Sequence, residues 1–262
     1  LYNCRLFKEK SKFIWDRPKF VNDHHFIFGY YGVPEKNPIE LITPVPDGFK
    51  TLITQERGKD SLNFWFPEIE ADSLEFALKT IDSTYNVSVK FYKPKLDSLT
   101  INSLQNRSID LNDTLKFNSS LPIYELNKEF ITLKNKDSIL LPFELILDKN
   151  KDLIKMHFNQ EPNDKYSITI LPNAFKDMWE ATNDTINLSL ITKGYDSYGV
   201  INFRLDWKIQ EQDFILELLD IKNNIIGRLS EINDLNKYSF KLLNPKNYKA
   251  RIILDDLSLI HI

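Results

Sequence analysis

The chain has 262 residues, 42% of them hydrophobic and 27% charged, which is the composition of a globular protein with one large or two to three small domains. Its net charge of -3 excludes an excess of positive charge for capturing nucleic acid or an anionic membrane. Only 7 glycines occur, without a GxGxxG or GxxxxGK[ST] pattern, which argues against phosphate-binding loops. No apolar run approaches the ~20 residues that a membrane-spanning helix needs.

Alternation of apolar and polar residues with a period of two dominates the sequence, and no helical periodicity extends over a dozen residues. The alternating runs are rich in Phe, Ile, Val, Thr and Tyr, as expected of strands with one buried face. We expect strands at 61–66, 73–79, 85–92, 98–104, 165–171, 185–192, 199–207 and 248–254. Short strands with turn signals every eight to twelve residues predict an all-β chain of tandem β-sandwiches.

Prolines and shifts in composition mark the expected boundaries between domains. Several segments are short for sandwiches but have acceptable sizes. The expected units are a tail of a preceding domain at 1–17, a sandwich at 18–104, a second at 105–193 and a third, truncated one at 194–256.

A short unit, Asp-[Ser/Thr]-[Leu/Ile], recurs before the alternating runs. An Asp and a hydroxyl residue can close a turn by bonding nearby backbone amides, and the following Leu or Ile then starts the buried face. The alternative is a repeated cation ligand, but single Asp-Ser steps lack the clustered carboxylates of a calcium loop. We expect turns at Asp60, Asp72, Asp97, Asp113, Asp137 and Asp184.

The single cysteine and the two ends of the chain give limited information. Because Cys4 is the single cysteine of the chain, an internal disulfide framework is excluded. The residues before Cys4 lack the small side chains of a lipidation site. The last residues, "LSLIHI" at 257–262, match the translation of a common sequencing adapter. We therefore expect a metagenomic fragment whose native sequence stops near Asp256.

Candidate metal ligands are few. His24 and His25 are adjacent, and neighbours in a strand point to opposite faces, so they cannot easily bind one ion. His157 has no second His or Cys at ligand spacing, and His261 lies in the adapter-like segment 257–262. We expect no metal and no cofactor.

Two pairs of carboxylates are candidates for the acid and base of a glycoside hydrolase. Glu68 and Glu70 would share one face of an extended segment, and Asp177 and Glu180 flank Trp179. Solvated edges and turns are the commoner location of such residues, and no GxSxG, HExxH or Cys-His arrangement occurs. The sequence therefore predicts no enzyme.

Tryptophan and tyrosine could supply stacking platforms for sugars. Trp65 and Trp207 lie within alternating strands, where packing in the core is the default. Only Trp179, in a segment broken by Pro172, has the context of an exposed platform. Trp179 is therefore the one residue expected to contact a ligand.

The segment Phe143 to Thr192 resembles the bacterial Ig-like domain of the S-layer type. Members of that family carry a strand with a central Tyr, a "p-x-a-f-x-D" step and a closing strand that ends in Thr. The matching residues here are Tyr166, Pro172, Ala174, Phe175, Asp177 and Thr192, and the usual Gly after the Asp is missing.

The last segment, "YGVINFRLDW" through "YSFKLLNPKNYKARIILDD", resembles a prealbumin-like β-module, with Pro245 to Tyr248 in place of the usual Pro-Gly-x-Tyr. The whole chain is similar to the C-terminal part of large cell-envelope lipoproteins of Bacteroidota. This resemblance implies a non-enzymatic protein anchored to the outer membrane, periplasmic or surface-exposed, with Ig-like modules that act as spacers or bind an envelope protein. The alternative is a carbohydrate-binding or accessory module of a polysaccharide-processing system, with a glycan as partner.

Overall fold

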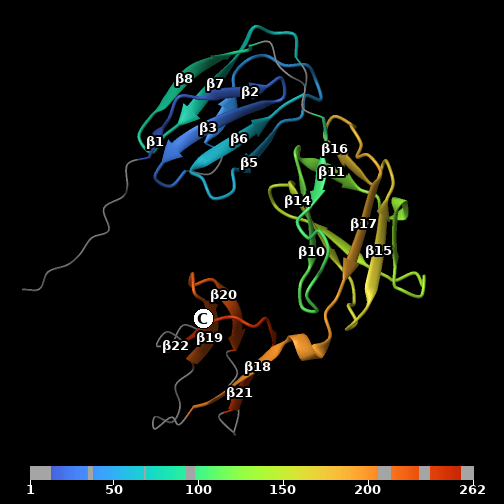
Figure 1. The fold of residues 1–262 in the computed structure, drawn as a ribbon. Helices are drawn as coiled ribbons and strands as arrows, with labels where there is room; N and C mark the ends of the chain where they lie inside the picture. Colours follow the sequence, from blue (N-terminus) through green and yellow to red (C-terminus); the bar gives the residue numbers. More distant parts are fainter. Residues whose placement is uncertain are drawn as a thin grey trace, which may run out of the picture.

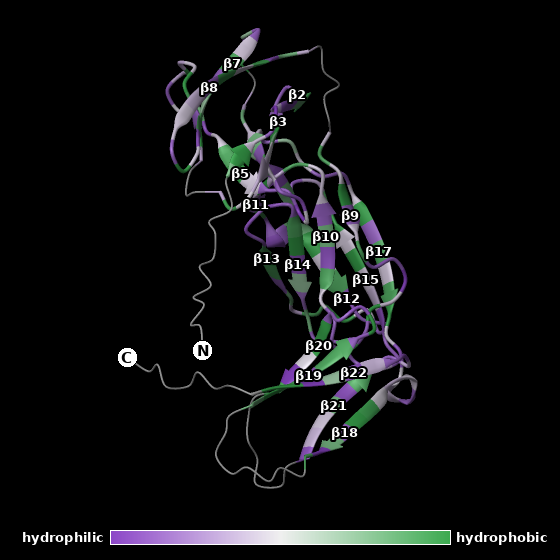
Figure 2. Ribbon diagram, turned by 90° about the vertical axis from the view of Figure 1, so that its left-hand side faces the viewer, coloured by the Kyte–Doolittle hydropathy of each residue, from purple (hydrophilic) through white to green (hydrophobic). Residues whose placement is uncertain are grey.

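The computed structural model describes residues 13–34, 38–67, 69–92, 98–205, 214–229 and 237–254. Figure 1 shows three successive units built from antiparallel sheets, coloured blue to teal, green to orange and orange to red. The prediction of an all-β chain of tandem β-sandwiches is confirmed. Apolar and polar residues alternate along strands such as β17 (Ile186–Ile191), as Figure 2 shows. Each sheet therefore turns one apolar face toward a core.

The first sandwich packs a five-stranded sheet against a three-stranded sheet. The larger sheet has the order β1-β3-β6-β5, and β2 also pairs with β3. Its strands are β1 (Ile14–Trp15), β2 (Lys19–Asn22), β3 (His25–Tyr31), β5 (Leu52–Gln55) and β6 (Ser61–Trp65). The smaller sheet consists of β4 (Ile39–Leu41), β7 (Ser73–Lys79) and β8 (Thr84–Lys90). The core between them is rich in phenylalanine, with Phe26, Phe28, Phe64 and Phe76 almost fully buried.

The second sandwich contains a four-stranded sheet of order β13-β14-β10-β9, a three-stranded sheet of order β12-β15-β17 and a two-stranded pair. The four strands are β9 (Ile101–Ser103), β10 (Leu115–Ser119), β13 (Glu144–Leu147) and β14 (Leu153–His157). The three-stranded sheet adds β12 (Ile131–Lys134) and β15 (Lys165–Ile170) to β17. The pair is β11 (Ile123–Leu126) with β16 (Phe175–Asp177), and it lies at the end nearest the first sandwich (Figure 1).

The third sandwich is smaller and has a separate core formed around Leu216, Leu218 and Phe240. One sheet pairs β18 (Gly199–Arg204) with β21 (Lys237–Leu243). The other has the order β20-β19-β22 and consists of β19 (Phe214–Asp220), β20 (Ile225–Leu229) and β22 (Tyr248–Leu254).

The helical content of the described residues is limited to two short 3-10 segments, η1 (Lys128–Phe130) and η2 (Tyr195–Ser197). In this part of the chain, no helix has the length and apolar character needed to cross a membrane.

Two domain boundaries differ from those drawn on the sequence. Phe13 and Trp15 were assigned to a preceding unit, but both are buried in the core of the first sandwich, and β1 pairs with β3. β9 was assigned to the first sandwich, but it pairs with β10 of the second. In both places apolar side chains decide the membership, because they pack into the core that covers them. Residues 1–12 and 257–262 lie outside the described residues.

The recurring Asp-[Ser/Thr]-[Leu/Ile] unit precedes strands at four described positions: Asp60, Asp72, Asp113 and Asp184. The expected side-chain bond to a following amide is found at Asp113, whose Oδ1 accepts from the amide of Thr114. At Asp137 the turn is instead closed by Asn135, whose Oδ1 accepts from the amides of Asp137 and Ile139. Asp97 lies outside the described residues.

Candidate functional site

The junction between the first and second sandwiches, called the first joint, is formed around β6. The three consecutive residues Phe64, Trp65 and Phe66 are all buried. Because side chains alternate along a strand, Phe64 and Phe66 enter the core of the first sandwich, whereas Trp65 enters the core of the second. Leu52 on neighbouring β5 also packs against that second core. The two sandwiches therefore share apolar packing and are not merely linked by chain.

Four aromatic rings meet at this joint. His25 stacks on Trp65 with ring centroids 3.8 Å apart and an interplanar angle of 13°. His24 lies against Trp179 at 4.7 Å, and the two tryptophans are 6.4 Å apart. Trp179 belongs to the turn after β16, so this contact spans the two sandwiches. The four rings thus form two pairs, His25 with Trp65 and His24 with Trp179, and the pairs contact each other through the two tryptophans.

Hydrogen bonds fix the rings in place. The backbone carbonyl of Phe66 accepts from Trp179 Nε1 at 3.1 Å and lies 3.1 Å from Nδ1 of His24. Trp65 Nε1 donates to the hydroxyl of Thr54 at 3.0 Å. The indole N–H of Trp179 is therefore used to hold the first sandwich.

Asp177 closes the turn that carries Trp179. Its Oδ1 accepts from the amides of Trp179 at 2.8 Å and Ala181 at 2.9 Å. The carboxyl group is 3% exposed, and its Oδ2 is buried without a hydrogen-bond partner among the described residues. Burial raises the pKa of Asp177, although the two amide donors oppose the shift.

Polar contacts also join the first and second sandwiches. The guanidinium group of Arg57, after β5, pairs with Asp148 and Asp152 of the loop between β13 and β14. Asn150 in that loop donates to the carbonyl of Gln55 at 2.9 Å. Both contacts join the same two sandwiches, so the first joint is held on an apolar side and a polar side.

The junction between the second and third sandwiches, called the second joint, is centred on Asp110. Its carboxylate accepts from Asn244 Nδ2 at 2.7 Å and from the Tyr198 hydroxyl at 3.1 Å, and Lys193 Nζ lies at 3.5 Å. Burial alone would raise the pKa of Asp110, but these two donors and the charge of Lys193 outweigh it and hold the pKa below the usual range. The buried clusters on the two sides are separate, so this joint is polar.

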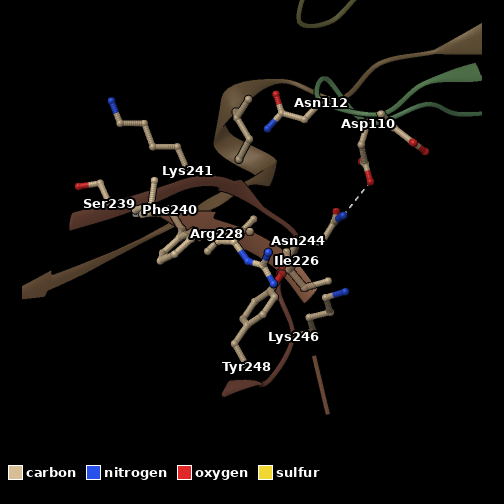
Figure 3. Close-up of a pocket in the computed structure, with 15 residues that line it drawn as sticks. Asp110, Asn112, Ile226, Arg228, Ser239, Phe240, Lys241, Asn244, Lys246 and Tyr248 are labelled. Atoms are coloured by element: carbon tan, nitrogen blue, oxygen red, sulfur yellow. Dashed lines mark hydrogen bonds between the residues drawn. The ribbon is translucent and has the colours of Figure 1, made fainter. Parts of the chain in front are cut away.

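An open groove of about 530 Å³ lies beside the second joint (Figure 3). The edge strands β20 and β21 and the loop 110–113 line it. Charges of both signs surround it, with Arg228, Lys241 and Lys246 on the third sandwich and Asp110 and Asp113 on the second. The groove has the amide, hydroxyl and charged groups that bind polar ligands.

Arg228 is also part of an ion triad on the third sandwich. Hydrogen bonds and charge from Arg251 and Arg228 hold the pKa of Glu217 below its usual range. The carboxylate of Glu217 is fully buried, while the two arginine side chains are half exposed.

No family model matches the chain, and no curated protein matches its sequence.

Several solved structures are similar. Domains A168–A170 of titin match at 12% identity with a TM-score of 0.24, over 93% of this chain and 92% of that one. An Escherichia coli alpha-2-macroglobulin segment spanning domains MG0-NIE-MG1 matches at 10% identity and 0.28, over 94% and 97%. SGBP-B of the Bacteroides ovatus mixed-linkage glucan utilization locus, in complex with a mixed-linkage heptasaccharide, matches at 10% and 0.28, over 85% of this chain and 64% of that one. At these TM-scores the similarities carry no argument about function.

The structure places the residues singled out in the sequence in different surroundings. Trp179 is half buried in the first joint, where it lies against His24 and Trp65, and within the described residues it belongs to no exposed row of rings. Direct contact with a ligand remains a prediction. The two carboxylates beside it diverge, because Asp177 is buried and Glu180 is exposed with a φ of 68°. His24 and His25 each pack on a different tryptophan, and His157 is exposed and contacts Thr114.

Other candidates do not converge on a site. Glu70 is exposed, and Cys4, Glu68, Trp207 and His261 lie outside the described residues. Within the described part of the chain, no group of three His, Cys, Asp or Glu side chains is arranged to bind a metal ion.

Two important residues were not identified from the sequence. Trp65 was expected in a core, but not in the core of the neighbouring sandwich. The signal was present: three aromatic residues in a row, Phe64 to Phe66, break the alternation and indicate a strand buried on both faces. Asp110 gave no comparable signal, because its partners lie 83 to 134 residues away in sequence.

Proposed function

We propose that this chain is a non-enzymatic cell-envelope protein whose β-sandwich modules act as a spacer and as a surface for protein interaction. The observation that carries the proposal is Trp65, which belongs to the first sandwich and is buried in the core of the second. Modules joined by flexible linkers or by small polar interfaces move relative to one another by default. An aromatic side chain of one module that is buried in the core of the next opposes that motion, and a spacer needs such stiffness.

The first joint also explains the residues that first suggested a site. The buried carboxylate of Asp177 holds a turn, and that turn presents Trp179 to the first sandwich. Each of these groups has a role in coupling two modules. The same segment that could have been read as an acidic, aromatic active site is thus used for assembly.

The location in the cell rests on the sequence resemblance. We propose an outer-membrane-anchored lipoprotein of a Bacteroidota envelope, because residues 143–192 and 194–256 are similar to modules of such proteins. Membrane fractionation of the native host, with metabolic labelling of lipid-linked protein, tests this. Recovery of the full-length protein in a lipid-free cytoplasmic fraction would contradict it.

The spacer proposal is tested by measuring how the modules tumble in solution. We expect ¹⁵N relaxation to give one common correlation time for residues of the first and second sandwiches. The third sandwich, held by the polar second joint, should give a shorter one. Different correlation times for the first and second sandwiches would refute the proposal of a stiff spacer.

A carbohydrate-binding or accessory module is the alternative, and the groove beside the second joint is the observation that favours it. Amide and hydroxyl groups of Asn112, Ser239 and Asn244 line that groove together with Arg228. Such groups bind sugar hydroxyls. A glycan array probed with the whole chain should give binding that Asn112→Ala weakens and that Asn187→Ala, on an exposed strand face of the second sandwich, leaves unchanged. Absence of binding to any glycan removes this alternative.

A further inference from the structure

The first joint contains a titratable ring at the contact between the two sandwiches. His24 lies against Trp179 with centroids 4.7 Å apart and planes inclined by 33°, so the imidazole covers part of the indole face. An ordinary histidine changes its charge near pH 6.5, and a cation over an indole face is attracted by the ring. The strength of this contact therefore depends on whether His24 carries a proton.

The hydrogen bond of His24 shows where the second proton would go. The carbonyl of Phe66 can only accept, so Nδ1 of His24, 3.1 Å away, carries the hydrogen in the neutral ring. Protonation then adds a hydrogen at Nε2 and keeps the bond to Phe66. Because the side chain is only partly buried, the charged ring retains contact with water.

The charged groups around His24 come from both sandwiches and include one buried carboxylate. Asp177 on β16 is the carboxylate on which the charge of His24 acts, and its Oδ2 is buried without a hydrogen-bond partner among the described residues. Asp23 and Glu180 are next to the two rings along the chain. The cation on β16, Lys176, is paired with Glu125.

The second histidine has its own surroundings. His25 stacks on Trp65 and its Nε2 lies 2.9 Å from Oδ1 of Asn63. The carboxylate influenced by its charge is Glu56, which also bonds Lys59 and Ser61. His25 and its tryptophan lie on the same sheet, so this pair does not bridge the sandwiches through its own contact.

We propose that the first joint is tightened by mild acid: protonation of His24 places a cation against the Trp179 ring and near the Asp177 carboxylate, and so strengthens the contact between the two sandwiches. The effect ends where Asp177 itself becomes protonated, and burial has raised the pKa of that carboxyl group.

Hydrogen exchange of the joint tests the proposal with the whole chain. The amides of Trp179 and Ala181 donate to Asp177 and report opening of the turn. After correction for intrinsic exchange rates, we expect their protection to rise roughly two- to fivefold between pH 7.5 and pH 5.5, the size of a partly exposed cation–π contact. His24→Gln keeps a neutral donor for Phe66 and should abolish the rise.

His157→Gln is the matched control, because His157 is exposed on β14 outside the joint. It should retain the full rise. If His24→Gln does not fold, Trp179→Leu and Asp177→Asn replace it, and each should reduce the rise while His24 is still present. No rise in the unmodified chain, or an equal rise in His24→Gln, overturns the proposal. Either result leaves the spacer proposal intact, since that depends on Trp65.

Discussion

Replacing Trp65 by alanine should weaken both the first and the second sandwich. The side chain is 7% exposed and lies in the core of the second sandwich. Loss of a buried tryptophan typically costs about 3–5 kcal/mol. Part of that loss comes from two interactions of the indole ring that alanine does not make. These are the hydrogen bond to Thr54, which contributes about 1 kcal/mol to stability, and the stacking on His25, which contributes about 0.5–1.5 kcal/mol. We expect a loss of about 3 kcal/mol or more in the second sandwich.

Trp15→Ala provides the matched control. Trp15 is also 7% exposed and its Nε1 also makes one hydrogen bond, to the carbonyl of Lys79, but it packs only in the core of the first sandwich. Peptide-resolved hydrogen exchange gives the opening free energy of each sandwich separately. A loss of 3 kcal/mol appears as roughly 150-fold faster exchange. Trp65→Ala should cause this faster exchange in β10 and β15, whereas Trp15→Ala should not. Equal effects of the two variants on those strands would refute the burial of Trp65 in the core of the second sandwich.

Three further predictions concern single polar groups. Tyr238→Phe removes a buried hydroxyl that has no partner among the described residues. The thermal midpoint of the third sandwich should therefore stay the same or rise, with a gain of about 1 kcal/mol in the free energy of unfolding. A clear fall of the midpoint would contradict this. Asp110→Asn should shorten the correlation time of the third sandwich at pH 7. The pKa of Asp110 is lowered from 3.8, so the carboxylate stabilises the second joint above that pH and stops doing so as the pH falls through its folded-state pKa. Below that pKa, the correlation time of the third sandwich in the unmodified chain should approach that of the variant. Asn183→Ala breaks bonds to Phe175, Leu171 and Asp184 and should cost about 2–3 kcal/mol in urea unfolding, against less than about 0.5 for the exposed Asn187→Ala.

The individual strands could be predicted from the sequence because their patterning is local. The alternation in 165–171 and 185–192 corresponds to β15 and β17, which pair directly. Between them, Phe175–Asp177 form the short strand β16, because their backbone pairs with β11, about fifty residues earlier. A three-residue strand is too short to show a period.

The joints could not be predicted because their contacts connect distant parts of the chain. Trp179 meets the carbonyl of Phe66 across 113 residues, and Asn244 meets Asp110 across 134. Exposed polar turns and interdomain contacts use the same residue types, so an Asp in a loop gives no indication of its partner. For Trp179, the segment broken by Pro172 suggested an exposed platform, whereas the structure places the ring in a contact between modules.

The position of Trp65 has a consequence for the order in which the chain folds during synthesis. Domains fold from the N-terminus as they emerge, so the first sandwich can form before the second is complete. Its folded sheet would then expose Trp65 on β6, and the second sandwich would form its core around that side chain. A fragment beginning near residue 98 would lack that ring, which belongs to the same buried cluster as Leu115, Ile123 and Phe175. Dividing this protein at its apparent domain boundary would therefore yield one complete module and one with an unfilled core.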